Sequence, residues 1–128
     1  MDYYKPCKEL NECNHLIDVY FTKGLYKECF DGHIKLAEKG YPLAECQIGY
    51  FYLNGLGCEK DLKAAFEWTS RAALHGDRDA QYNLAEFYIN GIGTSKNDKK
   101  AEKWLIAAAE QNQQEAKIRL KQFKPDAD

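Results

Sequence analysis

Apolar side chains along this chain recur at the spacing of a single helix face. They occupy Ala44, Ile48, Phe51 and Tyr52 in one segment and Ala65, Trp68 and Ala72 in the next. Intervals of three and four residues are typical of amphipathic α-helices that pack one side against a neighbour. No segment alternates convincingly between apolar and polar residues with a period of two. The pattern therefore predicts an all-α fold without strands.

The chain also contains an internal repeat of 36 residues. Residues 44–79 align without a gap on residues 80–115, and twelve of the 36 pairs are identical. Identical pairs include Phe51 with Phe87, Gly57 with Gly93 and Trp68 with Trp104. Self-similarity of this length indicates a stacked array of one supersecondary unit.

Each copy is predicted to consist of a helix, a glycine loop and a second helix. Asn-Gly-Leu-Gly follows the first apolar stripe, and glycine readily adopts the left-handed backbone that ends a helix. Asp61 is a favourable N-cap for the second helix, which Gly76 closes. The Gly-x-Gly loop follows a helix and not a strand, which argues against a nucleotide-binding fingerprint. Because small alanines allow close helix packing, we expect Trp68 and Trp104 to lie in the core beside them.

Composition and charge exclude several classes of function. The 128 residues are 45% hydrophobic and carry a formal charge of −2, so they can bury a core but offer no basic surface for nucleic acid. No apolar run approaches the length of a membrane span, and no secretory signal is visible at the N-terminus. Five cysteines, an odd number, favour reduced thiols. We therefore expect a cytoplasmic protein that binds neither nucleic acid nor membranes.

These residues resemble the Sel-one-like repeat family, which is related to the tetratricopeptide repeats. The family pattern is met at Ala44, Ile48, Gly49, Tyr52, Gly55, Gly57, Lys60, Asp61, Ala65, Trp68, Ala72, Ala73 and Gly76. The second copy follows it nearly as well, with Ala85 at the small position of the first helix and Asn112 at the closing glycine. The family's pair of cysteines that joins adjacent helices is missing, which again favours a reducing compartment.

The resemblance implies a right-handed α-solenoid of helix-turn-helix repeats with a C-terminal capping helix. We expect one domain over 1–128, with a degenerate first repeat at 10–43, repeats at 44–79 and 80–115, and the capping helix at 116–124. Gly32 falls where Trp68 and Trp104 stand in the later copies, so the first repeat should be less well filled.

The resemblance also implies that a partner protein or peptide binds the concave face, which the first helix of each repeat lines. By analogy with tetratricopeptide geometry, the exposed residues there are His15, Gln47, Tyr50, Asn54, Tyr82, Asn83, Glu86, Asn90 and Arg119. They form a mixed polar and aromatic surface of the kind used in recognition.

The cysteines and histidines leave one chemical alternative open. Cys29 and His33 are four residues apart on one helix, and Cys13 and His15 lie one helix earlier, so together they offer four zinc ligands or a thiol–imidazole pair. No Cys-x-x-Cys element is present, and the simpler explanation is that Cys13, Cys29 and Cys46 are small residues packed in the core. No nucleophile elbow, Walker loop or zincin helix occurs, so we expect neither a cofactor nor catalysis.

The sequence thus predicts a non-catalytic module that binds another protein. One specific role is an immunity protein that neutralises a cognate bacterial toxin or effector, and the broader alternative is a cytoplasmic adaptor or scaffold. A zinc-binding or thiol-based regulatory protein is the remaining alternative. The molecule is expected to be a monomer or a weak homodimer.

Overall fold

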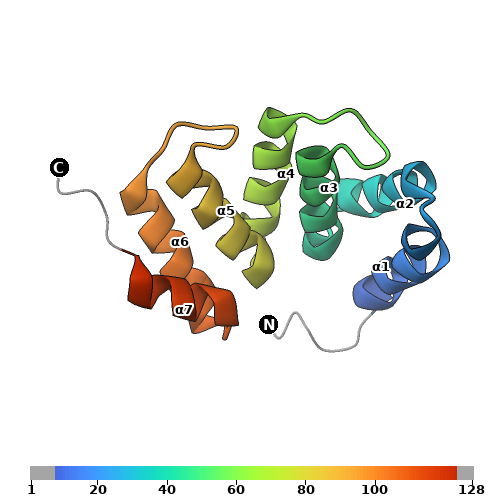
Figure 1. Cartoon of the computed structure of the whole chain (residues 1–128). Coiled ribbons are helices and arrows are strands. Elements are labelled where there is room, and N and C mark those ends of the chain that lie inside the picture. The colour runs from blue at the N-terminus through green and yellow to red at the C-terminus, as the bar shows by residue number, and fades with distance from the viewer. Residues whose placement is uncertain (1–7, 124–128) are drawn as a thin grey trace.

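The computed structural model describes residues 8–123, and their regular structure is entirely helical. The elements are α1 (Lys8–Val19), a 3₁₀ turn η1 (Phe21–Lys23), α2 (Tyr26–Glu38), α3 (Pro42–Asn54), α4 (Leu62–Leu74), α5 (Arg78–Asn90), α6 (Asp98–Glu110) and α7 (Gln114–Gln122). Consecutive helices lie side by side along a curved path, and the α3–α4 and α5–α6 loops emerge on the same edge (Figure 1). The predicted right-handed α-solenoid is confirmed. The domain limits at 1 and 128, and the predicted end of the capping helix at 124, lie outside the described residues.

A shift of 36 residues reproduces the helix limits along the array. Helix α3 maps onto α5, and α2 maps onto α4 and then onto α6, with the same start and end positions. Side-chain caps set several of these starts: the carboxylate of Asp61 accepts from the Ala64 N–H, and the amide oxygen of Asn97 accepts from the Lys100 N–H. Helix α1 ends at Val19, one residue later than this shift places it, and the η1 turn stands in the connection where the later copies have the glycine loop.

The second glycine of each Gly-x-Gly loop is required by packing between repeats. Gly57 has φ 72°, and a Cβ there would stand 2.3 Å from the Tyr26 carbonyl oxygen at the start of α2. Gly93 repeats the arrangement, since its Cβ would stand 2.3 Å from the Leu62 carbonyl oxygen at the start of α4. Each loop therefore presses its backbone onto the preceding repeat, which no larger residue would allow.

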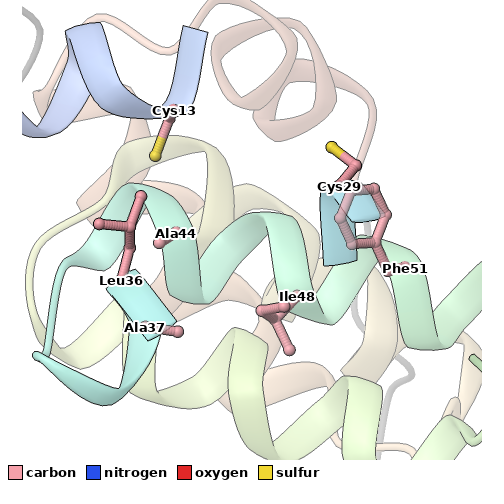
Figure 2. Close-up of a cluster of buried hydrophobic side chains, with 7 residues drawn as sticks. All are labelled: Cys13, Cys29, Leu36, Ala37, Ala44, Ile48 and Phe51. Atoms are coloured by element: carbon pink, nitrogen blue, oxygen red, sulfur yellow. The ribbon is translucent and has the colours of Figure 1, made fainter. Parts of the chain in front are cut away.

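The core consists of three apolar clusters that follow one another along the array. The first joins α1, α2 and α3 around Cys29, Ile48 and Phe51, each with 0% exposure (Figure 2). The second lies between α3, α4 and α5, and the third between α5, α6 and α7. Fully buried alanines recur in all three, so neighbouring helices approach closely throughout.

The two tryptophans are only half-buried, which corrects the expectation that they lie inside the core. Trp68 packs against the edge of the first cluster, and Trp104 packs against the edges of the second and third. The Arg71 guanidinium lies over the Trp68 ring, 4.5 Å from its centre. An array only two helix layers thick encloses alanines completely, but it leaves one side of so large a ring in contact with solvent.

Each repeat also contains a polar contact between its first helix and the end of its second helix. In the first matched pair of helices, the carboxylate of Glu45 lies 2.6 Å from Nδ1 of His75, and Glu45 is buried. At the positions 36 residues later, Gln111 Nε2 donates to Gln81 Oε1 over 3.0 Å. The same contact is thus made by a titratable pair in one copy and by two neutral amides in the next.

Because the two pairs are equivalent, we predict that the Glu45–His75 contact stabilises the fold through its hydrogen bond and not through its charge. The double substitution Glu45→Gln/His75→Gln should leave the free energy of unfolding within about 1 kcal/mol of the parent, because it reproduces the amide pair of the later copy. The single substitution His75→Ala should cost about 1–3 kcal/mol, since the buried carboxylate then loses its partner. Urea unfolding measures both values, and a double variant as unstable as His75→Ala would contradict the prediction.

Candidate functional site

The candidate binding surface is formed by the first helix of each repeat, α1, α3, α5 and α7. All nine residues predicted for it lie on these four helices. His15, Tyr50, Asn54 and Asn90 are exposed, while Gln47, Tyr82, Asn83, Glu86 and Arg119 are half-buried. We call these nine residues the first-helix surface.

The structure brings three of the predicted residues together at the C-terminal end of this surface. Nε of Arg119 donates to Oε1 of Glu86 over 2.9 Å, which ties α7 to α5. Tyr82 lies beside them and shares a shallow pocket of about 170 Å³ with Arg119. Burial raises the pKa of the Tyr82 phenol, and the nearby carboxylates of Glu86 and Glu115 raise it further. The phenol therefore keeps its proton as a hydrogen-bond donor.

Two asparagines of the surface already use their amides within their own helices. Nδ2 of Asn54 donates to the carbonyl oxygen of Tyr50, and Nδ2 of Asn90 donates to that of Glu86, each over 3.0 Å. Both residues close the last turn of their helix just before the glycine loop. Both side chains are exposed, so the amide oxygen of each can accept a hydrogen bond from a ligand.

Tyr50 is the largest exposed apolar side chain of the surface, with 45% of its area in contact with solvent. It stands on α3 between Gln47 and Asn54, at the centre of the array. His15 lies apart from this group, because it lines a separate groove between α1 and α2. The sequence predicted a less well filled first repeat at Gly32, which lines that groove, but it did not single out Ile118, which is 56% exposed on α7 and lines the pocket with Tyr82 and Arg119.

The four residues considered as zinc ligands are not gathered into one site. Among the described residues, no three His, Cys, Asp or Glu side chains are placed to share a metal ion. Cys13 is buried in the core cluster, whereas His15 is exposed. Side chains two residues apart on a helix point in nearly opposite directions, so Cys13 and His15 cannot bind the same metal ion.

Cys29 and His33 do lie side by side, but burial keeps both of them neutral. The Sγ of Cys29 is 3.5 Å from Nδ1 of His33, and both residues have 0% exposure. Burial raises the pKa of the Cys29 thiol and lowers the pKa of the His33 imidazole. His33 Nδ1 lies 2.9 Å from the Cys29 carbonyl oxygen, so this nitrogen carries the proton of the neutral ring. The pair is a packed contact and not a thiolate–imidazolium nucleophile.

The other two described cysteines with perturbed thiols are also protonated. Burial raises the pKa of Cys46 well above its ordinary value, with a further contribution from the Asp77 carboxylate. Burial and the charge of Asp61 raise the pKa of Cys58. These environments suppress thiolate formation, so they give no support to the thiol-based alternative.

None of the helices within 8–123 has both the length and the apolarity to cross a bilayer.

Comparison with known proteins identifies the repeat and its fold. A family model described as the Sel1 repeat matches residues 42–77 and 78–113. A Sel1 repeat protein from Oxalobacter formigenes superposes with a TM-score of 0.78 at 34% identity, over 84% of this chain and 44% of that chain. Cysteine rich protein B of Helicobacter pylori superposes with a TM-score of 0.74 at 28% identity, over 86% of this chain and 84% of that one.

Two curated relatives match shorter segments. The chitin synthase regulator SKT5 of Saccharomyces cerevisiae is 36% identical over 53 residues, which are 41% of this chain and 8% of that protein. Its counterpart in Malassezia restricta is 46% identical over 46 residues, which are 36% of this chain and 3% of that protein. The matched segments therefore make up less than a tenth of the length of either relative.

The buried imidazole predicts a loss of stability in mild acid. Because the folded pKa of His33 lies below the value of about 6.5 for the unfolded chain, the unfolded state binds more protons between these two values. The stabilising contribution is therefore complete above pH 6.5 and declines, by at most about 1.4 kcal/mol per pH unit, as the pH falls toward the folded pKa.

Urea unfolding at several pH values from about 7.5 to 5 measures this slope. His33→Asn retains a side-chain N–H donor but no titration, so its slope should be smaller than that of the parent. His15→Gln changes an exposed histidine and should leave the slope unchanged. Equal slopes for the parent and His33→Asn would show that His33 does not carry the linkage.

Proposed function

The chain belongs to the Sel1 repeat family, and from this premise we propose that it is a non-catalytic module that binds another protein on its first-helix surface. Sel1 repeats are protein-interaction modules. A relative that carries a similar segment is called a chitin synthase regulator, which is a role that a binding module can fill without chemistry of its own.

The observation that carries this proposal is how the two copies differ. Positions that face the core are the same or similar in α3 and α5, as with Ala44 and Ala80 or Phe51 and Phe87. Other positions diverge in chemistry. The exposed Tyr50 corresponds to the half-buried Glu86, and the buried Cys46 corresponds to the half-buried Tyr82, whereas Gln47 and Asn83 are both amides. Two helices of the same shape thus present an irregular set of groups, which a specific partner requires and a purely structural repeat does not.

The composition of the first-helix surface fits a protein ligand. Its charged groups are the paired Glu86 and Arg119, and its other members are amides, tyrosines and a histidine. Tyrosine gives large contact area at low entropic cost and is enriched among the residues that dominate binding energy. We assign Tyr50 and Tyr82 as the anchors, and Gln47, Asn83 and the two helix-closing asparagines as the surrounding polar contacts.

Among binding roles, we propose immunity against a cognate toxin or effector as the specific form, and a general adaptor or scaffold as the alternative. Neutralisation of a toxin needs only a complementary surface that covers its active groups. An adaptor needs the same surface with lower selectivity. The irregular outward groups of α3 and α5 favour a single preferred partner, as an immunity protein would have.

The test of the surface is capture of a partner from a lysate of the source organism, followed by affinity measurements on the purified partner. Tyr50→Ala should weaken that complex at least about tenfold, because a central tyrosine is lost. It should change the free energy of unfolding by no more than about 0.5 kcal/mol, since the side chain is exposed. Leu74→Ala, which removes an even more exposed apolar group from α4, is the matched control and should leave the affinity unchanged.

If Leu74→Ala weakens the complex and Tyr50→Ala does not, the partner binds elsewhere and the assignment fails.

Stoichiometry and growth distinguish an immunity protein from an adaptor. An immunity protein should form one 1:1 complex with a dissociation constant of about 1 nM or below, and it should restore growth to cells that express the partner. Several weaker partners without any rescue would instead support the adaptor.

A further inference from the structure

The groove between α1 and α2 lies apart from the α3, α5 and α7 part of the first-helix surface, with which it shares only His15. It has a volume of about 790 Å³, and its lining comes from these two helices alone. Leu16 on α1 and Leu36 on α2 contribute its apolar side chains. Among the described residues, the groove therefore lies at the N-terminal end of the helix array.

The groove exists because Gly32 stands where the later repeats have tryptophan. Gly32, Trp68 and Trp104 are spaced by 36 residues on α2, α4 and α6. Trp68 packs back against the cluster of the preceding helices, whereas Gly32 provides no side chain to fill the corresponding space. Leu16 leans over the glycine instead, since a Cβ at Gly32 would stand 2.5 Å from Leu16 Cδ2. The open volume therefore lies beside Leu16, and an apolar side chain from outside could pack there against Leu16 and Leu36.

The rim of the groove is predominantly basic. Lys8, Lys35 and Lys39 line it together with His15, and the opposing charge comes from Glu12. The Glu12 carboxylate already has Lys8 at 3.8 Å as its partner. Lys35 and Lys39 are exposed, and they lie four residues apart along one side of α2. An apolar floor with lysines along its edge is complementary to an amphipathic segment that carries acidic flanks.

A second copy of this chain is a poor occupant by the same criterion. The helix at the other end of the array, α7, has an exposed apolar residue in Ile118, but it carries Lys117, Arg119 and Lys121 against a single Glu115. Stacking α7 into the groove would place basic residues against basic residues, which costs free energy. We propose that the groove between α1 and α2 is a second docking site, which takes an acidic amphipathic helix of a partner protein.

The probe for this site is a synthetic peptide of about 14 residues, which as a helix is about as long as α1. It has Leu at positions i, i+3 and i+7, Trp at i+4 and Glu elsewhere, and a matched peptide has Lys in place of every Glu. Titration into the isotope-labelled full chain should shift the amide signals of α1 and α2, including those of His15 and Lys35. The Glu peptide should bind at least about tenfold more tightly than the Lys peptide.

Charge reversal locates the interaction. Lys35→Glu/Lys39→Glu should weaken the Glu peptide at least about tenfold, while Lys63→Glu/Lys99→Glu, a matched reversal of exposed lysines on α4 and α6, should change its affinity less than about twofold. Tyr50→Ala should have no effect on the peptide, so this test can fail or succeed independently of the first-helix surface.

Three outcomes would overturn the proposal. The first is equal affinity of the two peptides, and the second is a set of shifted signals confined to α3, α5 or α7. The third is a concentration-dependent dimer, seen by sedimentation, that Lys35→Glu/Lys39→Glu abolishes. That result would assign the groove to a second copy of the chain.

Discussion

Close approach of helices at small side chains is the constraint on which this array depends. Alanines with no exposed area separate neighbouring helices in every cluster, and the loop glycines Gly57 and Gly93 bring each repeat against the backbone of the one before. A larger group at either glycine would strike a carbonyl oxygen that cannot move without displacing the start of a helix. The uniform helix limits follow from this contact, because each repeat is positioned by backbone and not by adjustable side chains. Outward-facing groups are consequently held in a fixed register from α3 to α5.

A fixed backbone allows the chemistry of equivalent positions to vary. The contact between Glu45 and His75 becomes one between Gln81 and Gln111 without a change in the helices that hold it. Both versions supply a donor and an acceptor across the same span, which is what the packing needs. Outside the core, the change from Tyr50 to Glu86 has no packing cost, since neither side chain is fully enclosed. The Tyr50-to-Glu86 change therefore varies the chemistry at a position that a partner can contact.

The architecture was predictable from the sequence because its determinants are local and repeated. Helical spacing, caps and the 36-residue shift define the helices without knowledge of the tertiary structure. Burial was predicted less well: Trp68 matched a core stripe, yet the thin array leaves part of its ring exposed. The contact between Cys29 and His33 was predicted from their spacing, but its chemistry depends on complete burial, which favours two neutral groups. The Glu45–His75 contact spans 30 residues, and each residue alone resembles an ordinary surface group.

Within the described residues, the first and last parts of the helix array are chemically alike. The groove between α1 and α2 is edged by Lys35 and Lys39, and α7 at the other end is also basic. Heterologous contacts between identical units extend without limit unless something opposes them. In the proposed arrangement, like charge at the groove and on α7 opposes stacking of the apolar groove on Ile118. The same lysines would attract acidic segments of other proteins, so one feature would both oppose self-assembly and select the proposed occupant of the groove.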